Sequence, residues 1–170
     1  LGDYEKLIDV FENKPGDQPL FLFNVTMQNH SSYSDWDDYD NFTPDITVDG
    51  SSSKLLPAYL SLMKLSDEAI EGLVNYFSMQ DEDTMIVFFG DHQPTDSIVN
   101  PVLALYDKRC SDLTAEEEYL RYQVPFFIWA NFDIEEETGV EISPNFLGTK
   151  TLETAGLPLS SYFRFLSALN

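Results

Sequence analysis

Apolar residues recur along the chain at two spacings, one typical of helices and one typical of buried strands. Residues 4–12 repeat apolar side chains every three or four positions and predict a short amphipathic helix. Residues 55–79 extend the same spacing over a longer stretch, which predicts one long helix or two consecutive helices. Near the end of the chain, residues 146–157 and 160–169 are each predicted to be helical. Gly156 and Pro158 divide them into two helices.

Three continuous apolar runs predict strands. Residues 19–27 (PLFLFNVTM) show little alternation between apolar and polar positions, as expected of a central strand that is covered on both faces. Residues 85–89 have the length of a buried strand, and polar residues bound them on both sides. Residues 124–130 form the third run, in which Pro125 favours a place near a sheet edge or at the start of a strand.

Long polar segments connect these elements. Residues 28–53 lack any periodicity, and a loop of this length in a compact domain is often functional. Residues 96–123 predict a loop with helical pieces, one of which would begin at Thr114, since Glu117 follows at capping-box spacing. Short strands alternating with helices predict an α/β fold, and a length of 170 residues fits a single domain.

Composition and charge narrow the classes of function. The chain is 43% hydrophobic and should fold, although its net charge is -21. With 30 acidic against 9 basic residues it would repel nucleic acid, and an anionic substrate would need a bound cation or a local basic cluster to reverse the local field. Cys110 is the only cysteine, which excludes an internal disulfide. No segment reads as a membrane span or signal peptide, and the chain opens without methionine, so we expect a piece of a longer protein.

The chain contains two histidines, and each directly follows a predicted strand. His30 follows the first strand, and Asp91 with His92 follows the second after Gly90. Open α/β sheets bind ligands beyond the carboxyl ends of their strands, and an Asp-His pair offers one oxygen and one nitrogen to Zn²⁺, Mn²⁺ or a similar ion. Two interpretations remain open for the pair: a metal site, or an aspartate that caps a turn beside an ordinary surface histidine.

Other candidate sites carry less information. His30 could be a polar loop residue or a donor to a substrate phosphate. Residues 35–40 contain four aspartates but lack the glycine and terminal glutamate of an EF-hand loop, so we interpret them as a solvated loop. No serine or threonine lies in a recognisable nucleophile elbow, and no phosphate-binding glycine motif is present.

Several of these segments, in order and spacing, resemble the sulfatase-like lipoteichoic acid synthase family of bacteria. The specific parts are residues 26–30 (TMQNH) and residues 90–94 (GDHQP), and residues 125–131 (PFFIWAN) extend the likeness. The resemblance implies an alkaline phosphatase superfamily fold, with a mixed β-sheet between helices. It also implies that residues 1–170 form the carboxy-terminal portion of one catalytic domain.

The resemblance further implies roles for individual residues. Asp91 and His92 would bind a divalent metal, Mn²⁺ in the first place, with Mg²⁺, Zn²⁺ or Ca²⁺ as alternatives. His30 would contact the phosphate or sulfate group of a phosphoglycerol lipid or another ester. Family members are membrane-anchored through upstream segments and act outside the cytoplasmic membrane, so we expect the parent protein at the outer face of a bacterial cell membrane.

The chain departs from the family in two respects. Ser31 and Ser32 stand where family members often have two glycines. The family's threonine nucleophile and a metal-binding glutamate belong to an amino-terminal half that this sequence does not include. No catalytic residue is therefore expected in this chain, and the fragment alone should be inactive. A sulfatase or phosphodiesterase-type hydrolase, and a noncatalytic binding module with the same fold, remain alternatives to the transferase.

Overall fold

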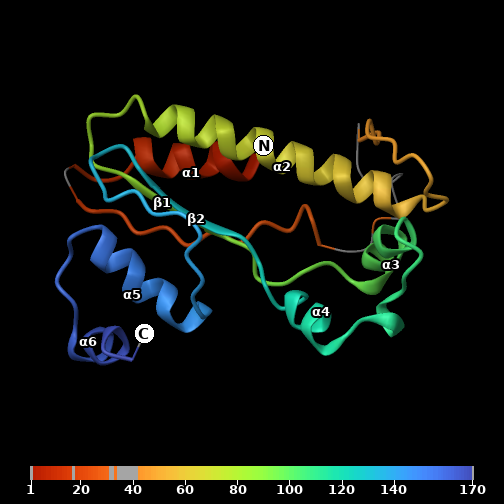
Figure 1. Cartoon of the computed structure of the whole chain (residues 1–170). Coiled ribbons are helices and arrows are strands. Elements are labelled where there is room, and N and C mark those ends of the chain that lie inside the picture. Colours follow the sequence, from red (N-terminus) through yellow and green to blue (C-terminus); the bar gives the residue numbers. More distant parts are fainter. Residues whose placement is uncertain (1, 17, 31–32, 34–41, 170) are drawn as a thin grey trace. The chain divides into compact units, whose positions relative to one another are not determined.

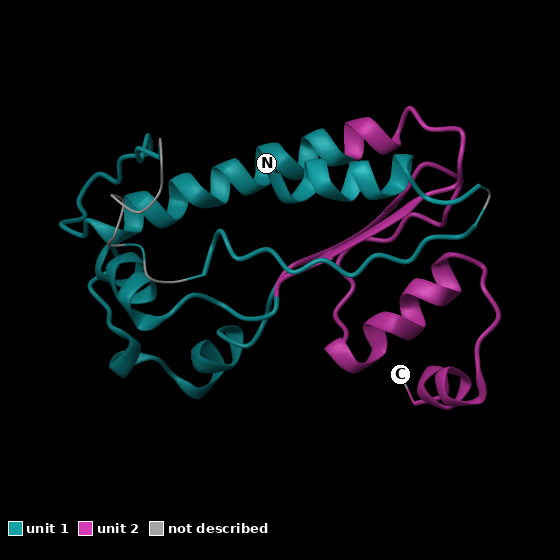
Figure 2. Cartoon of the chain, turned by 180° about the vertical axis from the view of Figure 1, so that it is seen from behind, with its two compact units in different colours: residues 1–73, 91–124 teal, residues 74–90, 125–170 magenta. Residues whose placement is uncertain are grey.

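The computed structural model describes residues 2–16, 18–30, 33 and 42–169 (Figure 1). The chain divides into two compact units. Unit 1 contains residues 1–73 and 91–124, and unit 2 contains residues 74–90 and 125–170 (Figure 2). In the described part of the chain no helix is long and apolar enough to cross a membrane.

Unit 1 is mainly helical. Helix α1 spans Gly2–Glu12, and the long helix α2 begins at Leu55 and ends at Phe77, its last turn belonging to unit 2. After the strand of unit 2 the chain returns to unit 1 and forms α3 (Asp96–Ala104), the 3-10 turn η2 (Cys110–Asp112) and α4 (Ala115–Leu120).

The core of unit 1 lies between the first half of α2, helix α3 and the segment that precedes α2. Leu56, Leu62 and Ile98 are almost fully buried there, together with Tyr33. Ser53 begins α2, because its hydroxyl accepts the backbone N–H groups of Leu55 and Leu56, which lack partners within the helix.

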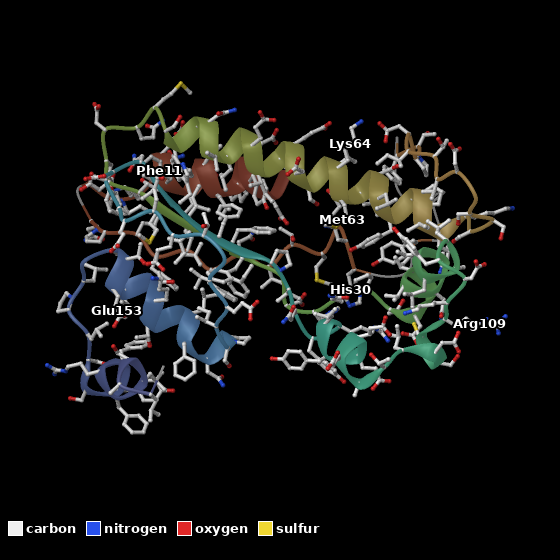
Figure 3. All side chains as sticks on the ribbon, viewed as in Figure 1. Phe11, His30, Met63, Lys64, Arg109 and Glu153 are labelled. Atoms are coloured by element: carbon white, nitrogen blue, oxygen red, sulfur yellow. The ribbon has the colours of Figure 1, made fainter. Side chains whose placement is uncertain are left out.

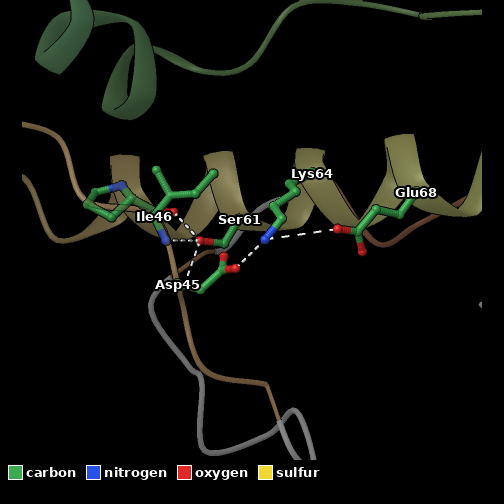
Figure 4. A network of polar contacts seen from close by, with 6 residues as sticks. Asp45, Ile46, Ser61, Lys64 and Glu68 are labelled. Carbon is green, nitrogen blue, oxygen red and sulfur yellow. Dashed lines mark hydrogen bonds and ion pairs between the residues drawn. The ribbon is translucent and has the colours of Figure 1, made fainter.

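Ser61 ties the preceding segment to α2. Its buried hydroxyl accepts the backbone N–H groups of Asp45 and Ile46, both at 3.1 Å, and donates to the Pro57 carbonyl at 2.8 Å (Figure 4). One turn further along, Lys64 donates to the Asp45 carboxylate and lies 3.9 Å from Glu68. The buried Ser61 hydroxyl therefore both donates and accepts hydrogen bonds, as most buried polar groups do.

Unit 2 is built on two antiparallel strands, β1 (Met85–Phe89) and β2 (Phe126–Ala130). Met85 pairs with Ala130, and the register runs to Phe89 opposite Phe126. Phe88 and Phe127 stack across the pair with ring centroids 5.4 Å apart. Helices α5 (Pro144–Thr154) and α6 (Ser161–Ser167) follow and contact each other.

Most elements predicted from the pattern are present. The predicted helix at residues 55–79 is a single helix, the strand at residues 85–89 has the predicted bounds, and Thr114 and Glu117 form the predicted capping box. The strand predicted at 124–130 begins two residues later, since Pro125 has no N–H to donate.

The strand predicted for residues 19–27 is wrong. This segment is not assigned to any strand, and most of its large apolar side chains are exposed, with Phe21 87% and Phe23 70% accessible. An apolar run adopts strand structure only where another strand supplies hydrogen-bond partners, and among the described residues β1 pairs only with β2. The run is therefore exposed instead of central.

Candidate metal centre

The site begins where β1 ends. The backbone N–H of Gly90 donates to the Pro125 carbonyl at 3.0 Å, which continues the β1–β2 ladder one residue beyond the strand. Asp91 and His92 then follow on an exposed bend. The sequence thus places two potential ligands directly after a hydrogen-bonded strand, as predicted.

Asp91 and His92 contact each other through both of the aspartate's oxygens. Asp91 Oδ1 accepts the backbone N–H of His92 at 2.8 Å, and Asp91 Oδ2 lies 3.5 Å from His92 Nε2. On the other side of the ring, His92 Nδ1 lies 2.9 Å from the backbone carbonyl oxygen of Gln93. A carbonyl oxygen only accepts, so Nδ1 carries the proton of this hydrogen bond.

These contacts leave two lone-pair donors close together. With Nδ1 protonated in a neutral ring, His92 Nε2 is an acceptor that faces the acceptor Oδ2 of Asp91. Two acceptors gain nothing from each other unless a proton or a cation lies between them. Metal ligands of these types lie about 2.0 to 2.2 Å from Zn²⁺, so a pair up to about 4 Å apart can share one ion. The donor set and its 3.5 Å separation fit a divalent metal.

The pair is incomplete as a metal site. The side chains of Asp91 and His92 are 78% and 65% exposed, and no group of three His, Cys, Asp or Glu side chains among the described residues could hold a metal. A structural or catalytic metal usually takes at least three protein ligands. The described residues therefore supply no third His, Cys, Asp or Glu ligand, and the assignment of Asp91 and His92 as ligands stays a prediction.

Gln93 fixes the loop that carries the pair, a role that sequence analysis missed. Its amide Nε2 donates to the backbone carbonyls of Leu120 at 3.0 Å and Gln123 at 2.8 Å. Leu120 is the last residue of α4, and Gln123 lies three residues beyond it. The loop is therefore attached to a segment about 30 positions further along the chain. A glutamine directly after the ligand pair was the available signal, but its acceptors cannot be read from the sequence.

His30 lies on a turn that α2 holds in place. The His30 backbone N–H donates to the Met27 carbonyl at 3.1 Å, which closes the turn. Gln28 donates to the Leu62 carbonyl at 3.2 Å, and Asn29 donates to the Ser66 hydroxyl at 2.9 Å. Figure 3 shows His30 on one side of α2, with Lys64 projecting on the other. The anchoring side chains are thus the two amides of the TMQNH segment that directly precede the histidine.

His30 is not a third ligand of the pair, since no such group of three exists among the described residues. Its predicted contact with a substrate phosphate stays a prediction. The four aspartates at residues 35–40, and the serines at 31 and 32, lie outside the described residues.

Comparison with known proteins identifies the family. The sequence model described as Sulfatase matches residues 4–157, nine-tenths of the chain. The chain belongs to the sulfatase family. The predicted membership of the alkaline phosphatase superfamily is thereby confirmed, and the predicted α/β fold class agrees with it.

Two proteins illustrate the relationship. The phosphoglycerol transferase GacH of Streptococcus pyogenes, solved in complex with sn-glycerol-1-phosphate, has the same fold over 97% of this chain, with a TM-score of 0.65 and 18% identity. A curated protein of Rhizobium meliloti (strain 1021), named "Putative cyclic beta-1,2-glucan modification protein", is 28% identical over 162 residues. This sulfatase-family chain spans 40% of the GacH chain and 24% of the Rhizobium protein.

Proposed function

We propose that this chain is part of a metal-dependent phosphoglycerol transferase of the lipoteichoic acid synthase-like branch of the sulfatase family. The observation that carries the proposal is the Asp91–His92 pair, whose Oδ2 and Nε2 converge at 3.5 Å. The fold of a phosphoglycerol transferase supports the same branch. Metals in such sites neutralise the developing negative charge of a phosphate ester, and a cation is favoured in a chain whose net charge is -21.

Each residue of the site has a distinct part in the proposal. Asp91 and His92 hold the cation, for which Mn²⁺ is the first candidate, and the Gln93 carbonyl keeps the His92 ring in the tautomer that binds metal through Nε2. His30 orients a nonbridging phosphate oxygen. The threonine that attacks the ester lies in a part of the parent protein that this sequence does not include, and an acceptor hydroxyl or water resolves the covalent intermediate.

The proposal extends to substrate and location. The donor is a phosphoglycerol lipid at the outer face of the bacterial cell membrane, where the parent protein is anchored. The acceptor is a hydroxyl group, and the glucan-modifying name of the Rhizobium relative favours a saccharide in this role. A hydrolase of the same family would use water in place of that acceptor and would share Asp91 and His92.

Metal binding by the parent catalytic domain tests the proposal directly. We expect His92→Ala and Asp91→Ala each to weaken Mn²⁺ binding at least about tenfold, because each removes a ligand. Electron paramagnetic resonance of free Mn²⁺ measures the change. Asp83→Ala, at an exposed aspartate before β1, is the matched control and should bind as the wild type does.

Two results would contradict the proposal. One is Mn²⁺ affinity in the parent domain that neither ligand substitution changes. The other is phosphodiesterase turnover by the purified 170-residue chain that Asp91→Ala abolishes, because it would mean that the nucleophile lies within this chain.

A further inference from the structure

A groove of about 760 Å³ lies in unit 1, and Asp91, His92 and His30 are not among the residues that line it. One wall is the turn that precedes α2, another is a single face of α3, and the third is the segment around η2. Most of the side chains that line it are short and polar. The lining consists of residues 50–53, Asp96, Asn100, Pro101, Ala104 and residues 109–111. This volume falls within the range of about 300 to 1,000 Å³ that is typical of small-molecule sites.

Specific contacts hold these walls in place. Asn100 Oδ1 accepts the backbone N–H of Cys110 at 2.9 Å, which fixes η2 against α3. Asp96 pairs with Arg121 at 2.7 Å between Oδ1 and Nη2. Gly50, at φ +82°, lets the opposite wall turn closely over α3, where a Cβ on Gly50 would lie 3.6 Å from Leu105. The groove is therefore formed by the fold itself.

The lining offers hydrogen bonds of both kinds with little net charge. Ser51 and Ser53 use oxygen lone pairs to accept backbone N–H groups at 3.2 Å, so each hydroxyl keeps its own hydrogen to donate. Ser111 donates to Asp112 at 2.9 Å and keeps lone pairs to accept. The amide nitrogen of Asn100 supplies further donors. A ligand that matches such a lining both donates and accepts at several neighbouring atoms.

The charges around the groove favour a neutral ligand. Asp96 forms an ion pair with Arg121, which offsets its charge in part. Burial first, and the remaining negative charge of Asp96 second, raise the pKa of the Cys110 thiol, which stays uncharged at neutral pH. The remaining cation, Arg109, is exposed and extends outward from the ribbon (Figure 3). One exposed guanidinium is a weak basis for an anion site. The other polar groups of the lining are suited to hydrogen bonding with the neutral hydroxyl groups of a ligand.

The groove begins close to the ligand pair. Asp96, which lines it, follows His92 by four positions, and four residues span at most about 14 Å. A saccharide of two or three units can bridge a distance of that order. We propose that this groove binds a neutral, hydroxyl-rich saccharide, and that it presents the acceptor hydroxyl to the site at Asp91 and His92. The acceptor role, though not the binding itself, rests on the function proposed above.

A titration of the ¹⁵N-labelled 170-residue chain with the glucose disaccharide sophorose tests the proposal. We expect amide shift changes confined to residues 50–53, 96–104 and 109–111, with saturation at millimolar concentration. A parallel titration with sn-glycerol-1-phosphate should leave these amides unchanged. Neither experiment involves metal or turnover, so failure here is distinct from failure of the metal-binding test.

Two matched variants sharpen the result. Ser52→Tyr places a ring in the groove at an exposed serine and should abolish the sophorose shifts, whereas Ser78→Tyr, at an exposed serine after α2, should retain them. The wild-type titration decides the matter even if a variant fails to fold. Sophorose shifts elsewhere in the chain, their absence at 50 mM, or equal shifts with sn-glycerol-1-phosphate would each overturn the proposal.

Discussion

The Asn131 side chain hydrogen-bonds to several backbone groups, a role that no sequence motif indicates. Its side-chain nitrogen lies 2.9 to 3.1 Å from the carbonyl oxygens of Phe77, Gln80 and Glu82, and its Oδ1 accepts the Thr84 N–H at 2.7 Å. One amide therefore joins the end of β2 to the whole connection between α2 and β1. An asparagine at this position has a structural role, separate from the chemistry at Asp91 and His92.

Asn131→Ala should lower the free energy of unfolding by about 2 to 3 kcal/mol, because several hydrogen bonds of about 1 kcal/mol each are lost together. Urea denaturation followed by circular dichroism measures the loss. Asn75→Ala, at an exposed asparagine of α2, should change stability by only a few tenths of a kcal/mol. Equal stability of the two variants would contradict the role given to Asn131.

Asp45 and Lys64 couple the stability of unit 1 to pH. Their hydrogen bond holds the pKa of the Asp45 carboxyl below its usual range and raises the pKa of the Lys64 ammonium. The stabilising contribution of Asp45 is present above about pH 4 and is lost as the pH falls through its lowered pKa. That of Lys64 is present below about pH 10 and is lost as the pH rises through its raised pKa.

Lys64→Met should therefore flatten the dependence of the unfolding free energy on pH at both the acid and the alkaline end. The effect is small, since both side chains are about half exposed. Urea unfolding between pH 3 and pH 11 measures it. Lys54→Met, at an exposed lysine before α2, is the control. Curves of the same shape for wild type and Lys64→Met would show that the pair contributes nothing.

Among the elements, local signals in the sequence predicted what local interactions determine. Residues 85–89 became β1 without a change of bounds, and the spacing of Thr114 and Glu117 gave the start of α4. Residues 19–27 carry the same apolar signal as β1 but are not a strand, because apolarity reports a tendency to be buried and not the presence of a pairing partner.

In the candidate site, too, the local contacts could be predicted from the sequence and the long-range contacts could not. Asp91 and His92 are adjacent in sequence, so their convergence could be predicted from a ligand pair after a strand. The acceptors of Gln93, the pairing of Asp96 with Arg121 and the groove itself depend on residues brought together from distant positions. No spacing rule links such residues, so the sequence alone could not reveal them.

The two threonines that begin α3 and α4 allow a direct comparison of caps. The Thr114 hydroxyl accepts the Glu117 N–H, whereas the Thr95 side chain makes no such bond to its helix. Thr114→Ala should lower the free energy of unfolding by about 1 kcal/mol. Thr95→Ala should cost clearly less. Chemical denaturation compares the two, and an equal or larger loss in Thr95→Ala would contradict this account of α4.

At the scale of the whole molecule, charge is the dominant property. A net charge of -21 on 170 residues means that folding brings like charges closer together. Added salt shortens the range of their repulsion, to about 10 Å at 0.1 M and about 3 Å at 1 M. The ion pairs among the described residues, such as Lys6–Asp9 and Lys108–Glu117, join partly or largely exposed side chains and contribute little against this trend.

The melting temperature should therefore rise by several degrees between 20 mM and 500 mM NaCl. Differential scanning fluorimetry at constant pH measures the shift. Potassium chloride at the same concentrations should give the same shift, because screening depends on ionic strength and not on which monovalent cation is added. A melting temperature that falls with salt would mean that attractive ion pairs outweigh the repulsion.

The exposed run at residues 19–27 gives the same charge a second consequence, which concerns solubility. Phe21, Phe23, Val25 and Met27 are all at least 60% accessible, and an extended apolar segment of this kind pairs readily with a copy of itself. Repulsion between strongly negative chains should keep such copies apart in dilute buffer. Salt that stabilises the fold of the single molecule therefore also weakens the electrostatic barrier to association. We expect the concentration range in which the chain stays monomeric to narrow as the ionic strength increases.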